Sequence, residues 1–274
     1  MLERAIPSTG ENLPVIGLGT WQQFDVDSAS AARGPLPDVL KRMQQKGGRL
    51  IDSSPMYGKS EERVGDLTAA SGNANTYFYA TKVWITGETN GIRQMETSMK
   101  KMRRATLDLM QVHNLQDWQT HLKTINEWKA QGRIRYTGIT HYTVSAHEEL
   151  ERIVRSKVVD FVQFNYSIGV RNAEKNLLNA CADSGVAVII NEPFEKGDLF
   201  RMVRGKRVPL WAADYGIYSW TQFFLKYIVA HPAVTCVIPG TSDPKHMEDN
   251  LQAGEGELPD ENGRRKMVAF IDSL

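Results

Sequence analysis

Short apolar runs alternate with segments of helical periodicity along nearly the whole chain. Apolar residues three or four positions apart, as in 36–45, predict a helix after most of these runs. The runs themselves are typical of buried strands. They cover Val15–Gly19, Leu50–Ile51, Tyr77–Val83, Leu107–His113, Ile134–Thr140, Phe161–Tyr166, Val186–Ile190 and Val234–Ile238.

This alternation predicts a parallel sheet covered by helices. About eight strand–helix units favour a closed (β/α)8 TIM barrel, and an open doubly wound sheet is the alternative. A barrel of this kind takes roughly 250 residues. No linker or composition break divides the chain, so we expect a single domain over residues 1–274.

One stretch, roughly Pro193–Tyr215, shows no clear periodicity and is rich in Lys, Arg and Gly. Long loops inside compact domains are usually functional or disordered. If this loop is functional, we expect it to fold over a bound ligand.

Composition narrows the class of protein. The formal net charge is only +1, which argues against nucleic-acid or membrane-surface partners. No apolar run is long enough to span a bilayer, and the start MLERAIPSTG has no apolar leader pattern. The two distant cysteines, Cys181 and Cys236, are typical of buried thiols in a reducing compartment. We expect a cytoplasmic monomer, and the absence of CxxC and HExxH patterns predicts no metal site.

Polar residues with complementary chemistry stand at the ends of successive predicted strands. Asp52 ends the second strand and Tyr57 follows it on the loop, while Lys82 and His113 lie at the ends of the next two strands. In a barrel, the carboxyl ends of the strands meet at one mouth, where catalysis takes place. These four side chains are therefore predicted to converge.

Together they could polarise a carbonyl group and protonate its oxygen. A free tyrosine has a pKa of about 10, and a nearby Lys82 ammonium is expected to lower that of Tyr57. Asp52 would keep Lys82 charged, and His113 would donate an N–H to the carbonyl oxygen. The set contains no nucleophile for the carbon, which indicates hydride transfer from a nicotinamide cofactor.

The chain resembles the aldo-keto reductases over nearly its whole length. The resemblance rests on GLGTW near the start, on Asp52 with the SSPMYGKSEERVG that follows it, on TKVW around Lys82, on the strand before His113, and on IPGTSDPKHMEDNL from Ile238. It implies a reductase of small-molecule carbonyl compounds that uses NADP(H), with NAD(H) also possible. In that family Tyr57 would be the general acid, Lys82 and Asp52 would tune it, and His113 would orient the carbonyl.

The same resemblance assigns cofactor contacts to the carboxyl ends of the later strands. The family's Ser-Asn pair on the nicotinamide amide is Thr140-His141 here, and Asn191 stands where an aromatic residue usually stacks on the ring. The remaining positions would contact the amide, the adenosine 2′-phosphate at the start of the helix after the last strand, and the adenine: Gln163, Gly240, Thr241, Ser242, Lys245, His246, Asp249 and Asn250.

Trp21, Trp84 and Trp118 follow strand ends and are candidates for the wall of a substrate pocket. Aromatic walls suit an apolar aldehyde or ketone. Two alternatives remain. One is a non-catalytic, nucleotide-binding barrel that serves as a redox-sensing subunit. The other is a metal-dependent barrel hydrolase that uses Asp52, His113 and His141.

Overall fold

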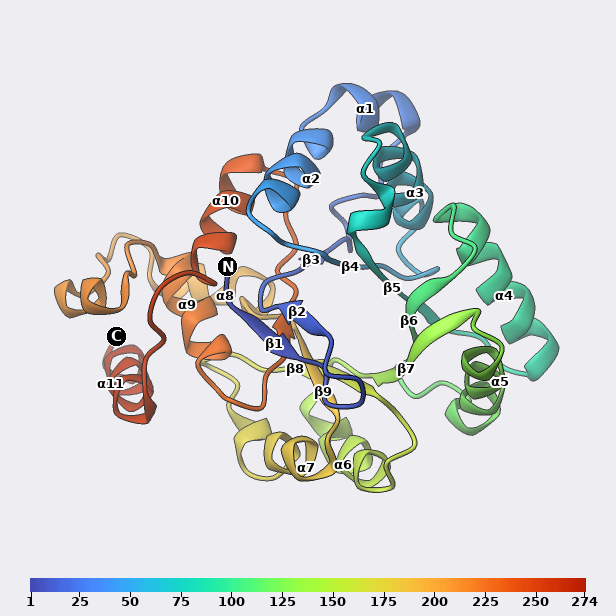
Figure 1. Cartoon of the computed structure of the whole chain (residues 1–274). Helices are drawn as coiled ribbons and strands as arrows, with labels where there is room; N and C mark the ends of the chain where they lie inside the picture. The colour runs from blue at the N-terminus through green and yellow to red at the C-terminus, as the bar shows by residue number, and fades with distance from the viewer.

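Eight parallel strands surround a central core in the computed structural model, which describes residues 1–274 (Figure 1). Neighbours in sequence are neighbours in the sheet, as the alternating pattern predicts. The predicted (β/α)8 barrel is confirmed. Its strands are β3 (Leu18–Gly19), β4 (Leu50–Asp52), β5 (Phe78–Val83), β6 (Leu107–His113), β7 (Ile134–Thr140), β8 (Phe161–Asn165), β9 (Ala187–Asn191) and β10 (Cys236–Val237).

The sheet closes between its first and last strands. The Gly17 N–H donates to the Val237 carbonyl at 2.8 Å, and the Val237 N–H donates to the Val15 carbonyl at 2.9 Å. A Cβ on Gly17 would lie 2.9 Å from the Leu50 carbonyl oxygen, so this close approach requires glycine. The open doubly wound alternative is therefore wrong.

Helices surround the barrel, and their apolar faces pack against the outer faces of the strands (Figure 1). In the second helix, for example, the predicted face of Leu36, Val39, Leu40 and Met43 is buried. The helices are α1 (Ser28–Arg33), α2 (Leu36–Gln45), α3 (Ser60–Ala70), α4 (Glu88–Lys101), α5 (Trp118–Ala130), α6 (His147–Arg155), α7 (Leu177–Ser184), α8 (Asp198–Met202), α9 (Trp220–Val229), α10 (Pro244–Gln252) and α11 (Glu261–Asp272).

The stretch predicted as a long loop, roughly 193–215, contains α8 and a 3-10 helix over Leu210–Tyr215. Aromatic contacts hold it against the later helices, because Trp211 packs on Phe223 and Phe270 with ring centroids 6.0 and 6.2 Å apart. This segment is thus partly helical and anchored to α9 and α11.

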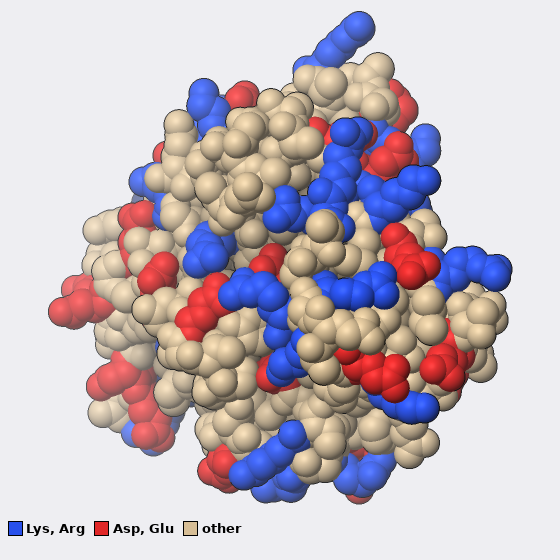
Figure 2. Space-filling view, turned by 45° about the vertical axis from the view of Figure 1, so that its right-hand side comes forward, with Lys and Arg blue, Asp and Glu red and all other residues tan.

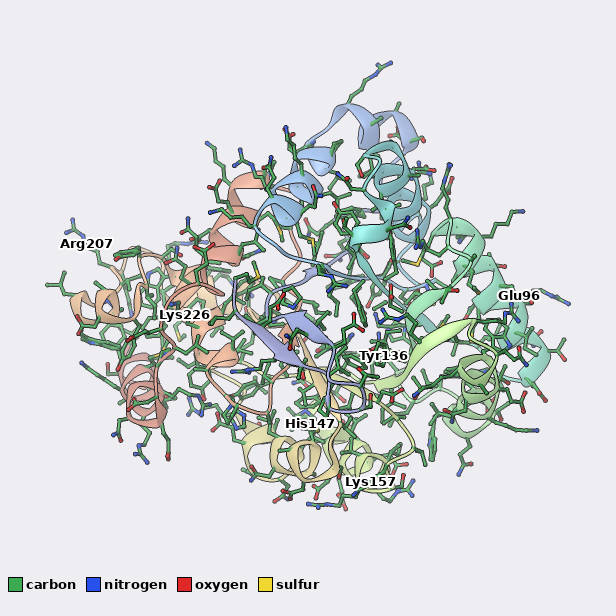
Figure 3. The ribbon with its side chains drawn as sticks, in the orientation of Figure 1. Glu96, Tyr136, His147, Lys157, Arg207 and Lys226 are labelled. Atoms are coloured by element: carbon green, nitrogen blue, oxygen red, sulfur yellow. The ribbon has the colours of Figure 1, made fainter.

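An antiparallel hairpin of β1 (Glu3–Ala5) and β2 (Asn12–Pro14) covers the amino-terminal end of the barrel (Figure 1). Beneath it, the barrel interior is filled by apolar side chains, among them a cluster of Phe78, Tyr136 and Phe161. The Tyr136 hydroxyl reaches back to the hairpin and donates to Glu11 at 2.7 Å (Figure 3). The hairpin and this apolar cluster occupy the amino-terminal end, and in barrels of this kind the active site lies at the carboxyl end.

The hairpin is also fastened to the last part of the barrel by Arg4. Its guanidinium donates to the carbonyl oxygens of Val229, His231 and Val234 at and after the end of α9. Val229 is the last residue of α9, and a helix end leaves its final carbonyls without helical partners.

We expect Arg4→Met to lower the free energy of unfolding by about 2 kcal/mol, because three charge-assisted hydrogen bonds at a helix end are lost. Chemical denaturation would measure the change. Lys41→Met is the control, since Lys41 is exposed and makes no side-chain contact of this kind. Equal losses in the two variants would contradict this role for Arg4.

The face shown in Figure 2 carries both positive and negative side chains, and several basic side chains adjoin one another in its upper part. Some opposite charges pair within one helix, as Arg155 does with Glu151 on α6 at 2.9 Å. No helix is both long and apolar enough to cross a membrane.

Candidate active site

The alternation of side chains along each strand places polar groups at the carboxyl end of the barrel interior. On β5, Phe78 and Ala80 belong to the interior core, and Lys82 continues the same face toward the mouth. Asp52 and His113 occupy corresponding positions at the ends of β4 and β6. The side chains predicted to converge therefore lie together at the mouth of the barrel.

Lys82 and Asp52 form a buried ion pair. The Lys82 Nζ donates to Asp52 Oδ2 at 2.5 Å and to the Ser53 carbonyl at 2.8 Å, and both side chains are almost entirely enclosed. Burial alone lowers the pKa of a lysine, but the negative charge of Asp52 and the Tyr57 phenol outweigh it and raise the pKa of Lys82. The ammonium therefore stays charged at neutral pH.

Two buried amides complete the hydrogen bonding of Asp52. Its Oδ1 accepts from Gln111 Nε2 and from Gln163 Nε2, each at 3.0 Å. The Gln163 Oε1 in turn accepts from Thr140 and Asn191, each at 3.3 Å. Gln163 thus ties the acidic centre to two further predicted site residues.

Gln111 was not among the predicted site residues. The signal was present, because Gln111 lies two positions before His113 on a strand and therefore shares its inward face. A fully buried glutamine in an apolar strand needs partners for its amide, and here the Asp52 carboxylate is one.

Tyr57 is half-buried beside the ion pair. Lys82 Nζ lies 5.1 Å from the centroid of its ring, and the ring meets that of His113 edge-on with centroids 5.9 Å apart. The chain turns sharply after it at Gly58, whose φ of +57° favours glycine and where a Cβ would collide with the Asp25 carboxylate.

The prediction that Lys82 lowers the pKa of Tyr57 is wrong in its net direction. Burial of the phenol raises the pKa above its usual value, and the charge of Lys82 offsets only part of that rise. Tyr57 therefore remains protonated at neutral pH and carries a proton that it can donate.

His113 is neutral. Burial, followed by the charges of Lys82 and His141, lowers its pKa to about 3. Its Nδ1 lies 3.0 Å from the hydroxyl of Ser54, and its Nε2 makes no hydrogen bond to the chain. An uncharged imidazole with one free nitrogen at the mouth can act as a hydrogen-bond donor or acceptor, depending on its tautomer.

Of the three predicted pocket residues, two lie exposed beyond strand ends and one does not. Trp21 follows β3 and Trp84 follows β5, and they are 47% and 37% exposed. Trp118 begins α5 and packs against the core, with Arg152 over its ring. Met56 and Tyr142 also follow strand ends and are each 45% exposed, so they join the candidates for the pocket wall.

At the end of β7, the His141 ring shapes the loop that follows. Its Nδ1 accepts the backbone N–H groups of Tyr142 and Thr143 at 3.0 and 3.2 Å, and its ring stacks on Tyr142. Asn191, at the end of β9, donates to the His141 carbonyl at 3.3 Å. The Asn191 Oδ1 is enclosed and has no hydrogen-bond partner, so it is an acceptor left free for a ligand.

The start of α10 is already capped by a carboxylate. Asp243 Oδ1 accepts the Lys245 N–H at 2.7 Å, and the Thr241 hydroxyl accepts the Asp243 N–H at 3.0 Å. That hydrogen bond from Lys245 lowers the pKa of Asp243, which is therefore charged at neutral pH. The residues at this helix start were predicted to contact a phosphate group of the cofactor, and the Asp243 cap was not predicted.

The other residues predicted to contact the cofactor after the last strand differ in their exposure and in the hydrogen bonds that they already make. Lys245 and His246 are exposed, and Ser242 is half-buried. Gly240 pairs with Gly19 across the closure of the barrel, and Asn250 is buried. The Asp249 carboxylate accepts from Ser219 and Gln222 of the neighbouring helix. These assignments remain predictions.

No group of three or more His, Cys, Asp or Glu side chains is placed to hold a metal ion. The Asp52 carboxylate, which the hydrolase alternative needs as a ligand, is occupied by Lys82 and two amides. A positively charged lysine in contact with it weighs against a cation there.

Residues 15–265 match the model of the aldo/keto reductase family. The chain is 24% identical to the aldo-keto reductase str7 of Strobilurus tenacellus over an alignment of 292 positions, gaps included. The alignment covers 86% of each chain. It is 25% identical over 254 residues to the NADH-specific methylglyoxal reductase of Escherichia coli (strain K12), with 81% of this chain and 76% of that relative covered.

Among solved structures, the fold is similar to that of an aldo-keto reductase from Klebsiella pneumoniae in complex with NADPH. The TM-score is 0.82 at 22% sequence identity, and 99% of this chain and 96% of that chain are covered. At this level of identity the likeness establishes the fold.

Proposed function

The chain belongs to the aldo/keto reductase family, and from this membership and its site we propose that it reduces an aldehyde or ketone to an alcohol with a reduced nicotinamide cofactor, NADPH or NADH. The observation that carries the proposal is the assembly of a protonated Tyr57, a charged Lys82 held by Asp52, and a neutral His113 at one mouth.

The residues present fit such a cofactor. The free, enclosed Oδ1 of Asn191 is an acceptor that suits the amide N–H of a nicotinamide, and Thr140 and His141 flank it. When bound, the cofactor would supply the hydride that no side chain of this site can provide.

The side chains supply the rest of the chemistry. His113 and Tyr57 bind the carbonyl oxygen, which orients the substrate and favours negative charge on that oxygen. Tyr57 then donates its phenolic proton to the oxygen, and the adjacent Lys82 ammonium stabilises the phenolate that forms. Asp52 and the amides of Gln111 and Gln163 hold Lys82 in place.

All these groups come from one chain, and we propose that a monomer is active. The two cysteines are unpaired and buried. Unpaired thiols and a reduced cofactor are typical of the cytoplasm, which is where we place the enzyme.

A fluorescence titration with NADPH and NADH, followed by an assay of cofactor oxidation with small aldehydes and ketones, would test the function. Methylglyoxal belongs in that set because the relative from Escherichia coli is named for its reduction. We expect binding and turnover. Binding without turnover of any carbonyl would favour the redox-sensing alternative, and no binding would contradict the proposal.

The Asp243 cap leads to a prediction about cofactor choice. Because the family places the adenosine 2′-phosphate near the start of α10, the negative charge of Asp243 should repel it. We expect Asp243→Ser, which keeps a capping oxygen, to tighten NADPH binding by about 3- to 10-fold. NADH affinity, read in the same titration, should change little.

Asp183→Ser is the matched control, because it removes one exposed carboxylate far from α10 and changes the net charge equally. Equal effects of both variants on NADPH binding would mean that net charge, and not the cap, sets the affinity.

A further inference from the structure

The hydroxyl of Ser54 lies between the loop that carries Tyr57 and the ring of His113. Ser54 is 0% exposed. Its Oγ is 3.0 Å from His113 Nδ1, and it accepts the Met56 N–H at 3.2 Å. The Ser54 carbonyl accepts the Tyr57 N–H at 3.0 Å, so the same residue shapes the turn that presents the phenol.

Counting protons determines the direction of the hydrogen bond to His113. A serine hydroxyl has one hydrogen to donate, and the contact with Met56 uses the oxygen as an acceptor. His113 Nδ1 is the only group placed to accept the Ser54 hydrogen. If Nδ1 carried a proton, the Ser54 hydrogen would be buried without a partner, which is unfavourable.

We propose that Ser54 is a positioning residue that donates to His113 Nδ1 and thereby fixes the imidazole as the Nε2–H tautomer. A neutral imidazole carries a single N–H. With Nδ1 occupied as an acceptor, that N–H is on Nε2, the nitrogen without a partner in the chain. Nε2 then faces a carbonyl oxygen as a donor, whereas the other tautomer would present a lone pair and repel it.

The pKa of His113, lowered to about 3, agrees with this assignment, because the ring is neutral at any pH at which the enzyme would work. The charge on Lys82 is one cause of that neutrality. Since His113 cannot gain a second proton near neutral pH, its tautomer alone decides whether it binds or repels the substrate.

The assignment itself can be tested without turnover. The chain contains only six histidines, so a 15N–1H correlation of the imidazole nitrogens, with His113→Gln to identify the signal, would show which nitrogen is protonated. We expect an unprotonated Nδ1 and a protonated Nε2 in the wild-type protein. A protonated Nδ1 would overturn the inference.

The functional consequence rests on the proposed reductase activity and needs variants. We expect Ser54→Ala to lower kcat/KM for the carbonyl substrate by about 10- to 100-fold, because the loss of a correctly placed donor or tautomer has at least that effect in other enzymes. Cofactor affinity should stay unchanged. Ser54→Thr, which keeps the hydroxyl, should retain the wild-type 15N signature and most of the activity.

Ser98→Ala is the matched control, since Ser98 is equally buried but lies on α4 and its hydroxyl has no partner. Wild-type activity together with an unaltered His113 signature in Ser54→Ala would overturn the inference. A third outcome separates the two proposals. If neither the wild type nor any variant reduces a carbonyl, but the 15N signature of His113 changes in Ser54→Ala, the reductase function is wrong and the tautomer assignment stands.

Discussion

We expect Tyr57→Phe to lower kcat/KM for carbonyl reduction by about a thousandfold or more, because the substitution removes the only protonated acid beside the substrate oxygen. Burial raises the pKa of Tyr57, so the wild-type phenol is fully protonated at neutral pH and ready to donate. The phenylalanine ring keeps the edge-on packing against His113. Binding of NADPH, measured by fluorescence, should therefore remain close to that of the wild type.

The control for this prediction is Tyr218→Phe. It removes a phenolic hydroxyl from an exposed tyrosine that precedes α9 and lies outside the ion-pair network. We expect it to keep most of the activity. If Tyr57→Phe retained more than about a tenth of wild-type kcat/KM, a loss smaller than any general acid normally produces, Tyr57 would not be the proton donor.

The fold could be predicted largely because each barrel strand is short, apolar and followed by a helical pattern. The hairpin β1–β2 was beyond that reasoning, since its strands have three residues each and show no clear alternation. The segment over residues 193–215 was predicted as a loop because its basic and glycine-rich sequence shows no helical periodicity over the short helix α8. Packing of Trp211 on Phe270, a contact made only in the folded chain, stabilises it.

The convergence of Asp52, Lys82 and His113 was predictable because the carboxyl ends of the strands meet at one mouth of a barrel. Gln111 and Ser54 were missed for a different reason. Each is a common polar residue whose role depends on one contact across the barrel, Gln111 to Asp52 and Ser54 to His113. The direction in which the pKa of Tyr57 shifts could not be predicted from the sequence either, because it depends on how deeply the phenol is buried.

The second large effect concerns stability as well as activity. We expect Lys82→Met to lower the free energy of unfolding by about 3–5 kcal/mol, because it leaves the Asp52 carboxylate buried without its countercharge. Activity should fall by at least about a hundredfold, since the Tyr57 phenolate loses its stabilising ammonium. Chemical denaturation and steady-state kinetics would measure the two effects.

A double variant separates charge burial from lost packing. Asp52→Asn removes the negative charge but keeps an oxygen that can accept from Gln111 and Gln163. Added to Lys82→Met, it should recover about half or more of the lost stability, because no uncompensated charge remains. It should recover none of the activity, since the ammonium is still missing.

Lys226 provides the control for this comparison of the single and double variants. It is as buried as Lys82 but lies on α9 (Figure 3), and its ammonium donates to the carbonyls of Tyr215, Glu255 and Glu257. Lys226→Met and Asp52→Asn should therefore be additive to within about 0.5 kcal/mol, as distant sites are. A Lys82→Met/Asp52→Asn double variant that was merely additive would show that the two charges do not stabilise each other. In that case Asp52 could not be what keeps Lys82 charged beside Tyr57.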